Sequence, residues 1–392
     1  MAPRLFLIDG NSLVYRAFFA LPDSIATSKG EPTNAIFGFA SMLVKILTEH
    51  GTAPTLVVWD GGWSGREQVY TEYKAERRSR PDLLKEQWPQ MEPLVEAFGY
   101  ANVRVEGFEA DDVIATLATQ AKEKRIDVTI VTGDRDAFQL IEPGVEVMAT
   151  SRGITDTKTY DREAVIERYG ITPEQIPDFY GLKGDSSDNI PGVPGIGDKT
   201  ASQLLNEYGD LETVLASVDK ISGAKRKQNL TEHADDARVS KELATAIRDV
   251  PGVDVDLEGT AAQEPDRSQL REVFRRWELR DPLRRLEEFF GEDGAAPERP
   301  TETTIHADVE QIDLAALPAW LERLGGRPVA LAVNAEPLRF AVYGGESAAA
   351  GAAASLAKLR IALGDHPIVA HDWKSTHLQE PDTLVHDTML AA

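Results

Sequence analysis

Three short apolar stretches of this chain each lead into an aspartate. They are residues 4–9 (RLFLID), 55–60 (TLVVWD) and 127–134 (DVTIVTGD), which end at Asp9, Asp60 and Asp134. In an open parallel sheet, ligands bind beyond the carboxyl ends of the strands. If these stretches are strands of one such sheet, we expect their carboxylates to gather at one edge.

Six further carboxylates extend this pattern: Glu109, Asp111, Asp112, Asp136, Asp185 and Asp188. Nine carboxylates at one place repel each other strongly unless divalent cations bind among them. Sites made only of oxygen suit Mg²⁺ or Mn²⁺. Two such ions roughly 4 Å apart activate water and stabilise the leaving oxygen in phosphodiester hydrolysis. The chain has no cysteine and no Ser–His–Asp pattern, so water is the nucleophile that the sequence favours.

Each acidic residue also has a structural explanation when it is taken alone. Asp9 and Asp60 precede glycine, and either could equally be a turn residue or a helix N-cap. Asp60 could also lie further from the ions and act through water. Glu109, Asp111 and Asp112 begin a predicted helix, where acidic residues complement the helix dipole. Their spacing predicts that Glu109 and Asp112 share one helix face and that Asp111 points elsewhere.

Three segments are suited to holding a phosphate backbone. Residues 192–200 (GVPGIGDKT) form a glycine-rich turn that opens a helix, where free N–H groups and Lys199 favour an anion. A helix–turn–helix packing turn explains the same segment equally well. Residues 73–80 (YKAERRSR) mix cations with an aromatic ring, which suits single-strand binding. The cluster at Lys225 and Arg226 is as consistent with a solvated surface as with DNA contact.

The composition is that of a folded protein with two or three domains. The chain has 392 residues, 42% of them hydrophobic and 27% charged, and no apolar run long enough to span a bilayer. The lack of cysteine fits a reducing cytoplasm. A net charge of −23 argues by itself against nucleic-acid binding, because Lys and Arg make phosphate contacts. Part of that charge belongs to the predicted metal site, however, and local basic clusters set the contact surface.

The order of elements predicts an α/β fold with a mostly parallel central sheet flanked by helices. Strands and amphipathic helices alternate through residues 1–150, which is typical of βαβ units. Residues 291–304 have the composition of a flexible linker. Beyond the linker we expect strands at 329–333 and 338–342 and a helix at 346–359. Apolar spacing predicts the earlier helices at residues 35–47, 110–121, 163–169, 199–208, 235–248 and 269–290.

Several motifs together resemble the 5′-nuclease domain of bacterial DNA polymerase I, a member of the flap endonuclease superfamily. They are LIDGNSLVYRAFFALP, TNAIFGF, YKAERR, GFEADDVIATLA, TGDRDAFQLI and GDSSDNIPGVPGIGDKTA. The resemblance implies a PIN-like catalytic domain at residues 1–180 and a helix–three-turn–helix DNA-binding subdomain at 181–290. It also implies that two Mg²⁺ or Mn²⁺ ions are held by Asp9, Asp60, Glu109, Asp111, Asp112, Asp134, Asp136, Asp185 and Asp188.

The resemblance further implies a helical arch at about residues 62–90, beneath which a 5′ single strand passes. The family usually has Phe before the first arginine of this arch, whereas this chain has Gly65. Contacts with the scissile region would come from Arg66, Tyr73, Lys74 and Arg77. The turn that grips duplex DNA, with a bound K⁺, would be formed by Gly192, Gly195, Gly197, Lys199 and Thr200.

Residues 305–392 resemble the first part of the 3′→5′ exonuclease-like domain that follows in these polymerases. The Asp-x-Glu pair of the proofreading type is missing from VALAVNAEPLRF, and DWKST at residues 372–376 replaces a second motif. We therefore expect no proofreading activity. The chain resembles a fragment of a longer polymerase, and a partial sheet with uncovered edges is expected to be less stable than the rest.

The expected function is that of a structure-specific 5′ nuclease, a cytoplasmic monomer with no membrane partner. Its expected substrates are branched or nicked duplex DNA with a 5′ flap and RNA primer–DNA hybrids. A junction-binding scaffold without catalysis is the alternative, since it would use the same basic clusters. A toxin-type ribonuclease on a similar sheet is a third hypothesis, but such proteins are short and the region 180–290 counts against it.

Overall fold

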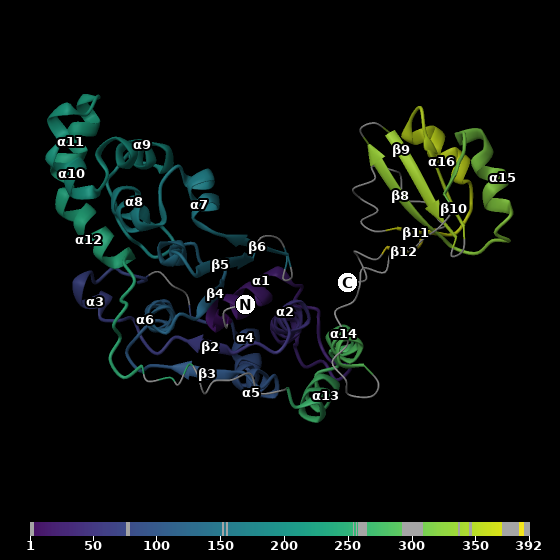
Figure 1. The fold of residues 1–392 in the computed structure, drawn as a ribbon, viewed down its shortest axis with the longest axis horizontal. Helices are drawn as coiled ribbons and strands as arrows, with labels where there is room; N and C mark the ends of the chain where they lie inside the picture. Colours follow the sequence, from purple (N-terminus) through teal and green to yellow (C-terminus); the bar gives the residue numbers. More distant parts are fainter. Residues whose placement is uncertain are drawn as a thin grey trace. The chain divides into compact units, whose positions relative to one another are not determined.

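The structure is a computed structural model. It describes residues 4–75, 79–150, 153, 156–253, 255, 257, 265–291, 309–335, 338–344, 347–370 and 384–387. The chain forms two compact units, Met1–Ala295 and Ala296–Ala392, whose elements are labelled in Figure 1. No helix in these stretches is long and apolar enough to cross a membrane.

A six-stranded sheet in the order β3–β2–β1–β4–β5–β6 forms the centre of the first unit. Neighbouring strands are parallel except for β5 and β6, which are antiparallel. Because β1 lies between β2 and β4, the three strand-end aspartates leave adjacent strands at one edge. The predicted α/β fold with a mostly parallel sheet is confirmed. The strands are β1 (Arg4–Asp9), β2 (Thr55–Trp59), β3 (Ala101–Arg104), β4 (Asp127–Thr132), β5 (Val145–Thr150) and β6 (Thr157–Tyr160).

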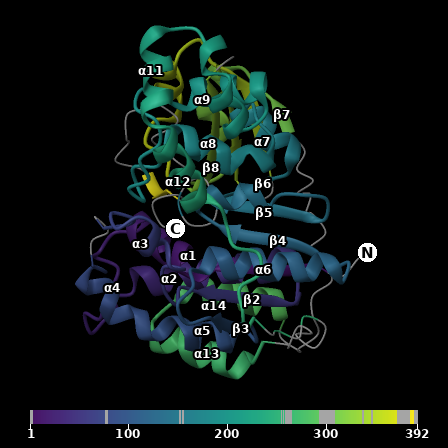
Figure 2. The same cartoon turned by 90° about the vertical axis from the view of Figure 1, so that its left-hand side faces the viewer.

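Helices cover both faces of this sheet (Figure 2). Alternate residues of β1 point to opposite faces, as the period of a strand requires. Leu5 and Leu7 pack in one core with α6 (Ala110–Glu123), whereas Phe6 and Ile8 pack in another. With both sides buried, the inner strands have the continuous apolar sequences from which they were predicted. The second core also contains residues of α1 (Gly10–Ala20), α2 (Asn34–His50), α5 (Met91–Ala97), α13 (Arg267–Arg276) and α14 (Arg280–Phe290).

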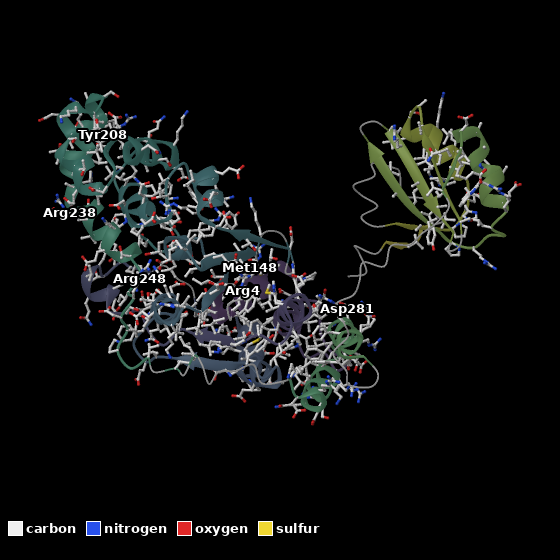
Figure 3. The ribbon with its side chains drawn as sticks, viewed as in Figure 1. Arg4, Met148, Tyr208, Arg238, Arg248 and Asp281 are labelled. Atoms are coloured by element: carbon white, nitrogen blue, oxygen red, sulfur yellow. The ribbon has the colours of Figure 1, made fainter. Side chains whose placement is uncertain are left out.

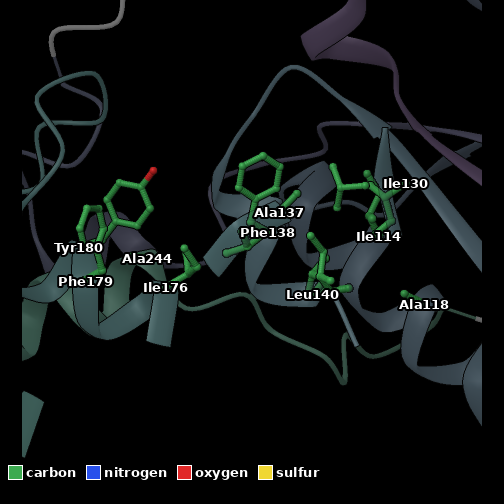
Figure 4. Close-up of a cluster of buried hydrophobic side chains, with 14 of the residues drawn as sticks. Ile114, Ala118, Ile130, Ala137, Phe138, Leu140, Ile176, Phe179, Tyr180 and Ala244 are labelled. Carbon is green, nitrogen blue, oxygen red and sulfur yellow. The ribbon is translucent and has the colours of Figure 1, made fainter. Parts of the chain in front are cut away.

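A helical module, defined here as α7 to α12, shares the core on the α6 side of the sheet. In Figure 4, Phe138 of the 3₁₀ helix η2 (Asp136–Leu140) lies between Ile114 and Ile130 on one side and Phe179 and Tyr180 on the other. The module is therefore attached to the sheet by continuous apolar packing. Its elements are α7 (Arg162–Tyr169), η3 (Pro173–Gln175), α8 (Ile176–Lys183), α9 (Asp198–Tyr208), α10 (Leu211–Ala216), η4 (Val218–Lys220), α11 (Ala224–Glu232) and α12 (Ala234–Ala244).

Two of the predicted helices of this unit differ from the structure. The helix expected at 235–248 ends at Ala244, because the backbone beyond it binds side chains from the sheet side of the unit. The helix expected at 269–290 is two helices, α13 and α14. The break lies at Glu278, which has φ of +55° and whose carboxylate accepts hydrogen bonds from Ser28. Because α13 and α14 pack against α5 and α2, the segment 181–290 is divided between the helical module and the opposite face of the sheet.

The second unit contains its own six-stranded sheet, in the order β12–β11–β8–β9–β10–β7. The strands expected at 329–333 and 338–342 are confirmed as β8 and β9. The helix expected at 346–359 is wrong in its first half, where pairing with β9 outweighs the helix propensity of alanine. Residues 292–304 and 372–376 lie outside the described residues. The elements are β7 (Val309–Gln311), η5 (Leu314–Ala316), α15 (Leu317–Glu322), β8 (Val329–Ala335), β9 (Leu338–Tyr343), β10 (Ala348–Ala352), α16 (Leu356–Leu363), β11 (Ile368–Ala370) and β12 (Leu384–Asp387).

Candidate active site

Asp9, at the end of β1, is both a helix cap and a member of an acidic group. Its carboxylate is buried and accepts hydrogen bonds from Ser12 N (2.9 Å) and from Thr132 Oγ1 (2.8 Å). The first of these bonds caps α1. Burial and the nearby carboxylates of Asp60 and Asp134 raise the pKa of Asp9 to about 7. The two interpretations of this residue are therefore compatible.

Asp60, which follows β2, joins the starts of two helices. Its Oδ1 accepts from Ala110 N at the start of α6 (2.9 Å), and its Oδ2 accepts from Asn11 Nδ2 in α1 (2.7 Å). The charge of Asp60 nevertheless contributes to the raised pKa of Asp9, so it stands near the same group. Its oxygens are already hydrogen-bonded, which suits the expectation that it would act on an ion through water.

Four of the predicted acids line one cavity of about 30 Å³: Glu109, Asp111, Asp136 and Asp188. Lys74 lines it as well. Its Nζ lies 2.6 Å from Glu109 Oε2 and 3.4 Å from Asp188 Oδ2. Burial and the charge of Asp134 raise the pKa values of Asp111 and Asp136 well above the ordinary range for aspartate. Like charges have therefore been brought together in a place with little water.

Asp188 reaches this cavity from the loop between α8 and α9, and Asp185 lies in the same loop without lining the cavity. Two hydrogen bonds attach that loop to the turn around Lys74. Lys74 N donates to Asp188 O (3.0 Å), and Asn189 Nδ2 donates to Glu72 O (2.7 Å). The charges of Asp185 and Asp188 both contribute to the raised pKa of Asp136. The predicted convergence thus extends to a loop about fifty residues further along the chain.

The predicted orientations of Asp111 and Asp112 are wrong: Asp111, and not Asp112, lies on the side of Glu109 that faces the cavity. Glu109 is the N-cap of α6, with an extended ψ of 152°, so the helical repeat does not yet apply to it. Asp111 lines the cavity beside Glu109. Asp112 is fully buried and its carboxylate accepts from Arg66 Nη1 (2.6 Å) and Nη2 (2.9 Å), from Ser64 Oγ and from Ile247 N (2.8 Å).

The segment predicted as an arch is described except for residues 76–78, so Arg77 lies outside the described residues. Gly65 has φ of +75° with open space where a side chain would be, so the glycine at this position suits the left-handed N-cap of α3. Lys74 also has a positive φ, of +54°. Strained backbone of this kind persists where surrounding contacts hold it, often at functional sites. The helices of this segment are α3 (Arg66–Val69), α4 (Asp82–Gln87) and η1 (Trp88–Gln90).

Tyr73, Lys74 and Arg66 all line the cavity of the acids, but Arg66 is also hydrogen-bonded to Asp112. The Tyr73 hydroxyl lies 3.4 Å from Glu109 Oε2, and Lys74 Nζ stands 4.9 Å from the centre of the Tyr73 ring. Arg66 is buried, and its Nε donates to Leu243 O (2.9 Å) in addition to the bonds with Asp112. Arg66 Nη1 comes no closer than 3.8 Å to Glu109 Oε1. Tyr73 and Lys74 are therefore the better placed of the three to act at the cavity.

The donor chemistry of the cavity suits hard divalent cations. Carboxylate oxygens are the ligands that Mg²⁺ takes, usually with several waters retained. Glu109 Oε1 is buried without a hydrogen-bond partner in the described part of the chain. With the side chains placed as they are, no three His, Asp or Glu residues of the described stretches form a ready ligand set. Direct ligation therefore requires side chains to turn, and ligation through water does not.

A larger, basic cavity of about 1090 Å³ lies beside η2 and the helical module. Arg135 at one of its walls stands between Asp134 and Asp136 in the sequence, so the cavity begins next to the acids. Lys199 and Thr200 of α9 line it, as predicted for a phosphate-binding surface. The cations lining it are Arg135, Arg168, Lys199, Lys220 and Arg226, against the acids Asp198 and Glu207. We call this cavity the basic groove.

The glycines of the predicted DNA-binding turn differ in how far backbone conformation and packing require a glycine. Gly192 has φ of +61°, and a Cβ there would come within 2.2 Å of Gly184 N, so packing alone requires a glycine. Gly195 also has a positive φ, and Pro194 O beside it accepts from Asn229 Nδ2 (2.6 Å). Gly197 has neither constraint and open space beside it, at the N-cap of α9.

Several residues around the acids were not predicted from the sequence. Ser64 Oγ accepts from Glu109 N (2.8 Å), and the Tyr180 hydroxyl hydrogen-bonds Asp136. Gln139 donates to Ala244 O (2.9 Å) and accepts from Ala246 N (2.8 Å). Of these, Gln139 carried a sequence signal, since it follows Asp136 by three residues in the TGDRDAFQLI motif.

The chain is similar to known 5′-3′ exonuclease domains and to bacterial DNA polymerases I. Residues 4–170 match the family model of the 5′-3′ exonuclease N-terminal resolvase-like domain, and residues 171–268 match that of the 5′-3′ exonuclease C-terminal SAM fold. DNA polymerase I of Bacillus caldotenax is 46% identical over 288 residues, which are 73% of this chain and 33% of that protein. DNA polymerase I of Chloroflexus aurantiacus is 38% identical over 382 residues, 96% of this chain and 39% of that protein. The chain thus spans between a third and two fifths of the length of these relatives.

Solved structures show the same fold. The bacteriophage T5 flap endonuclease, in a complex with DNA and metal ions, has a TM-score of 0.51 and 22% identity and covers 69% of this chain and 98% of its own. The catalytic core of Rad2 with a DNA substrate has a TM-score of 0.50 and 19% identity and covers 74% of this chain and 92% of its own. At these identities the likeness concerns the fold alone.

Proposed function

Because this chain belongs to the 5′-3′ exonuclease family, we propose that it is a structure-specific 5′ nuclease. It binds duplex DNA with a 5′ flap, or an RNA primer on DNA, and hydrolyses a phosphodiester near the junction. One observation carries the proposal: acids from separate segments of the first unit meet Lys74 at one cavity, at the carboxyl edge of the sheet. Two proteins of the same fold have been solved with DNA, one of them also with metal ions, and this is in keeping with the proposal.

Two divalent cations, Mg²⁺ or Mn²⁺, would supply an activated water and neutralise the charge that develops on the phosphate. Asp185 and Asp188 would complete the second position, and Asp60 would act through water. The fit rests on the oxygen-only donors and on the unpartnered Glu109 Oε1. The residues closest to the ions, directly or through water, would be Asp9, Glu109, Asp111, Asp134 and Asp136.

The remaining contacts would be made with the nucleic acid. Lys74 would stabilise charge on the scissile phosphate, helped by Tyr73 and by Arg77. The basic groove would follow the duplex backbone away from the acids, past Lys199, Thr200 and Arg226, with Lys225 nearby in sequence. Gly195 and Gly197 would allow the backbone of the turn to approach a phosphate, with K⁺ as a further ligand of the turn.

A flap-cleavage assay tests this function. A 5′-labelled flap duplex is incubated with the protein and Mg²⁺, with and without EDTA. We expect cleavage that EDTA abolishes, and an Asp136→Ala protein that binds the flap but does not cut it. Asp161→Ala is the matched control, because the Asp161 carboxylate caps α7 by accepting from Ala164 N. Flap binding without turnover in either Mg²⁺ or Mn²⁺ would instead favour a junction-binding scaffold.

A further inference from the structure

Five consecutive residues at the end of α12 and just beyond it are held by side chains from the sheet side of the unit. We call residues 243–247 the strap. Arg66 donates to Leu243 O and to Thr245 O, both at 2.9 Å. Gln139 binds Ala244 O (2.9 Å) and Ala246 N (2.8 Å), and Asp112 accepts from Ile247 N (2.8 Å). Each residue of the strap therefore has a main-chain group bound by Arg66, Gln139 or Asp112.

All three side chains already form hydrogen bonds within the protein. Nε, Nη1 and Nη2 of Arg66 all donate, to Leu243 O, to Asp112 and to Thr245 O. Both oxygens of Asp112 accept, and its side chain has no exposed surface. The carbonyls at the end of a helix lack partners within it, and a guanidinium there also complements the helix dipole. Arg66 and Gln139 therefore act as the C-terminal cap of α12.

The strap joins the two halves of the proposed nuclease. On one side, α12 packs along α8, and Ser240 Oγ accepts from Gly192 N (2.9 Å) in the turn before α9. On the other side, Asp112 lies in α6, Gln139 in η2 beside Asp136, and Arg66 at the start of α3. Arg248, labelled in Figure 3, adds a bond from Nη2 to Gln139 O (2.9 Å) just beyond the strap.

We propose that Arg66, Asp112 and Gln139 are positioning residues that fix the distance between the duplex-gripping module and the acids. They thereby decide which phosphodiester is cut. This inference rests on the proposed nuclease function. It assigns Arg66 to the strap in place of the scissile phosphate, and Asp112 to Arg66 in place of a metal ion. Every side-chain nitrogen of Arg66 and both carboxylate oxygens of Asp112 are already hydrogen-bonded within the protein.

The test reads the position of the cut, which a general loss of folded protein would not move. Gln139→Met removes three neutral hydrogen bonds, two to the strap and one to Asp136 O (2.9 Å). Arg66→Lys keeps the charge but loses the planar fork. On the flap duplex, we expect cleavage at the main position to fall about 10-fold, with new products one or more nucleotides to either side. Gln120→Met is the control, because Gln120 makes the same kind of bond to Val253 O (3.2 Å), outside the strap.

A second measurement separates positioning from metal ligation. Mn²⁺ affinity is titrated by isothermal calorimetry for Asp112→Asn and for Asp136→Asn. We expect Asp112→Asn to match the unaltered protein within about twofold, and Asp136→Asn to bind at least about tenfold more weakly.

The outcomes distinguish failure of the proposed nuclease function from failure of the positioning role. If the unaltered protein cuts no flap, the proposed function fails. If it cuts and the strap variants produce an unchanged pattern of cut positions, the positioning role is refuted. If Asp112→Asn binds Mn²⁺ as weakly as Asp136→Asn does, Asp112 is a metal ligand and its positioning role is refuted. If Arg66→Lys does not fold, Gln139→Met still tests the positioning role, because it removes only neutral hydrogen bonds.

Discussion

Lys74 is the buried cation that most directly offsets the cavity's carboxylates. It is 8% exposed and makes a 2.6 Å ion pair with Glu109, which is itself buried. A buried charge that loses its partner is costly, because neither water nor another charge compensates it. The pair therefore links the stability of this region to whatever other cations bind the acids.

We predict that Lys74→Met lowers the free energy of unfolding by ~3–5 kcal/mol in EDTA, measured by urea denaturation. Mg²⁺ should recover more stability in this variant than in the unaltered protein, because an ion can take the place of the lost ammonium beside Glu109. Lys85→Met is the control, since Lys85 pairs with Asp82 at the surface. A variant as stable as the unaltered protein in EDTA would contradict the prediction.

The acid group also predicts how stability changes with pH in EDTA. The pKa of Asp9 is raised from 3.8 to about 7 by burial and by neighbouring carboxylates. Between these values the folded chain binds a proton that the unfolded chain does not, so stability falls as pH rises from about 4 to about 7. Asp111, Asp134 and Asp136 shift in the same direction.

Urea denaturation at several pH values in EDTA measures this slope. Asp9→Asn should make it shallower, because one proton-binding group is removed and its charge no longer acts on the others. Stability that increases with pH across the same range would show that the acids are not held together as described.

At the scale of elements, the turn before α9 contains one glycine that packing requires and another that packing does not require. Gly192 and Gly197 both belong to the predicted DNA-binding turn, but of the two only Gly192 has a positive φ. A Cβ at Gly192 would stand 2.2 Å from Gly184 N and 2.5 Å from the carbonyl carbon of Lys183. A methyl group there must therefore displace the backbone around Gly184, whereas one at Gly197 meets nothing within 4 Å.

We predict that Gly192→Ala costs at least about 2 kcal/mol of folding stability, whereas Gly197→Ala leaves stability unchanged. Gly197→Ala should instead weaken binding to a flap duplex, because its effect is confined to the exposed approach to α9. Thermal unfolding and fluorescence anisotropy, run on both variants, distinguish the two effects. Equal stability of the two variants would refute the packing argument.

The sequence was sufficient where an element is defined by its own pattern. The three strands that lead into Asp9, Asp60 and Asp134 follow from their apolar runs, and the helix at Ala110–Glu123 follows from its helical spacing. The sequence was insufficient where a side chain from a distant segment determines where a helix ends. The helical pattern continues beyond Ala244, yet Arg66 and Gln139 take the backbone groups there. Glu278 likewise interrupts a favourable helix for a bond with Ser28, 250 residues away in the chain.

The candidate site shows the same division. Convergence of the acids could be predicted, because strand ends of a parallel sheet share one edge. The partner of Asp112 could not, because nothing in the letters EADD shows that Glu109 is a cap and that an arginine from another segment reaches the third acid. The contacts of Ser64 and Tyr180 also depend only on the folded arrangement.

At the scale of the whole molecule, the chain has two units with separate cores. The core of the second unit is built around Trp320 and Phe340 and, among the described residues, shares none with the cores of the first. A shorter unit buries a smaller fraction of its surface on folding and is correspondingly less stable.

We therefore predict that the second unit unfolds at a lower temperature than the first, in a separate calorimetric transition. Limited proteolysis should leave a resistant fragment that contains residues 4–290 and still cuts a flap. A resistant fragment formed by the second unit, with the first degraded, would contradict this order of stability.

The strap has one more consequence, for exchanging parts between relatives. The strap meets Arg66, Gln139 and Asp112 through main-chain atoms, which every amino acid except proline supplies alike. At the strap, a chimera that takes residues 171–268 from another polymerase would therefore meet its new host through groups that are the same in both parents. There the graft needs only the three receiving side chains in the host, and any residue except proline at 246 and 247.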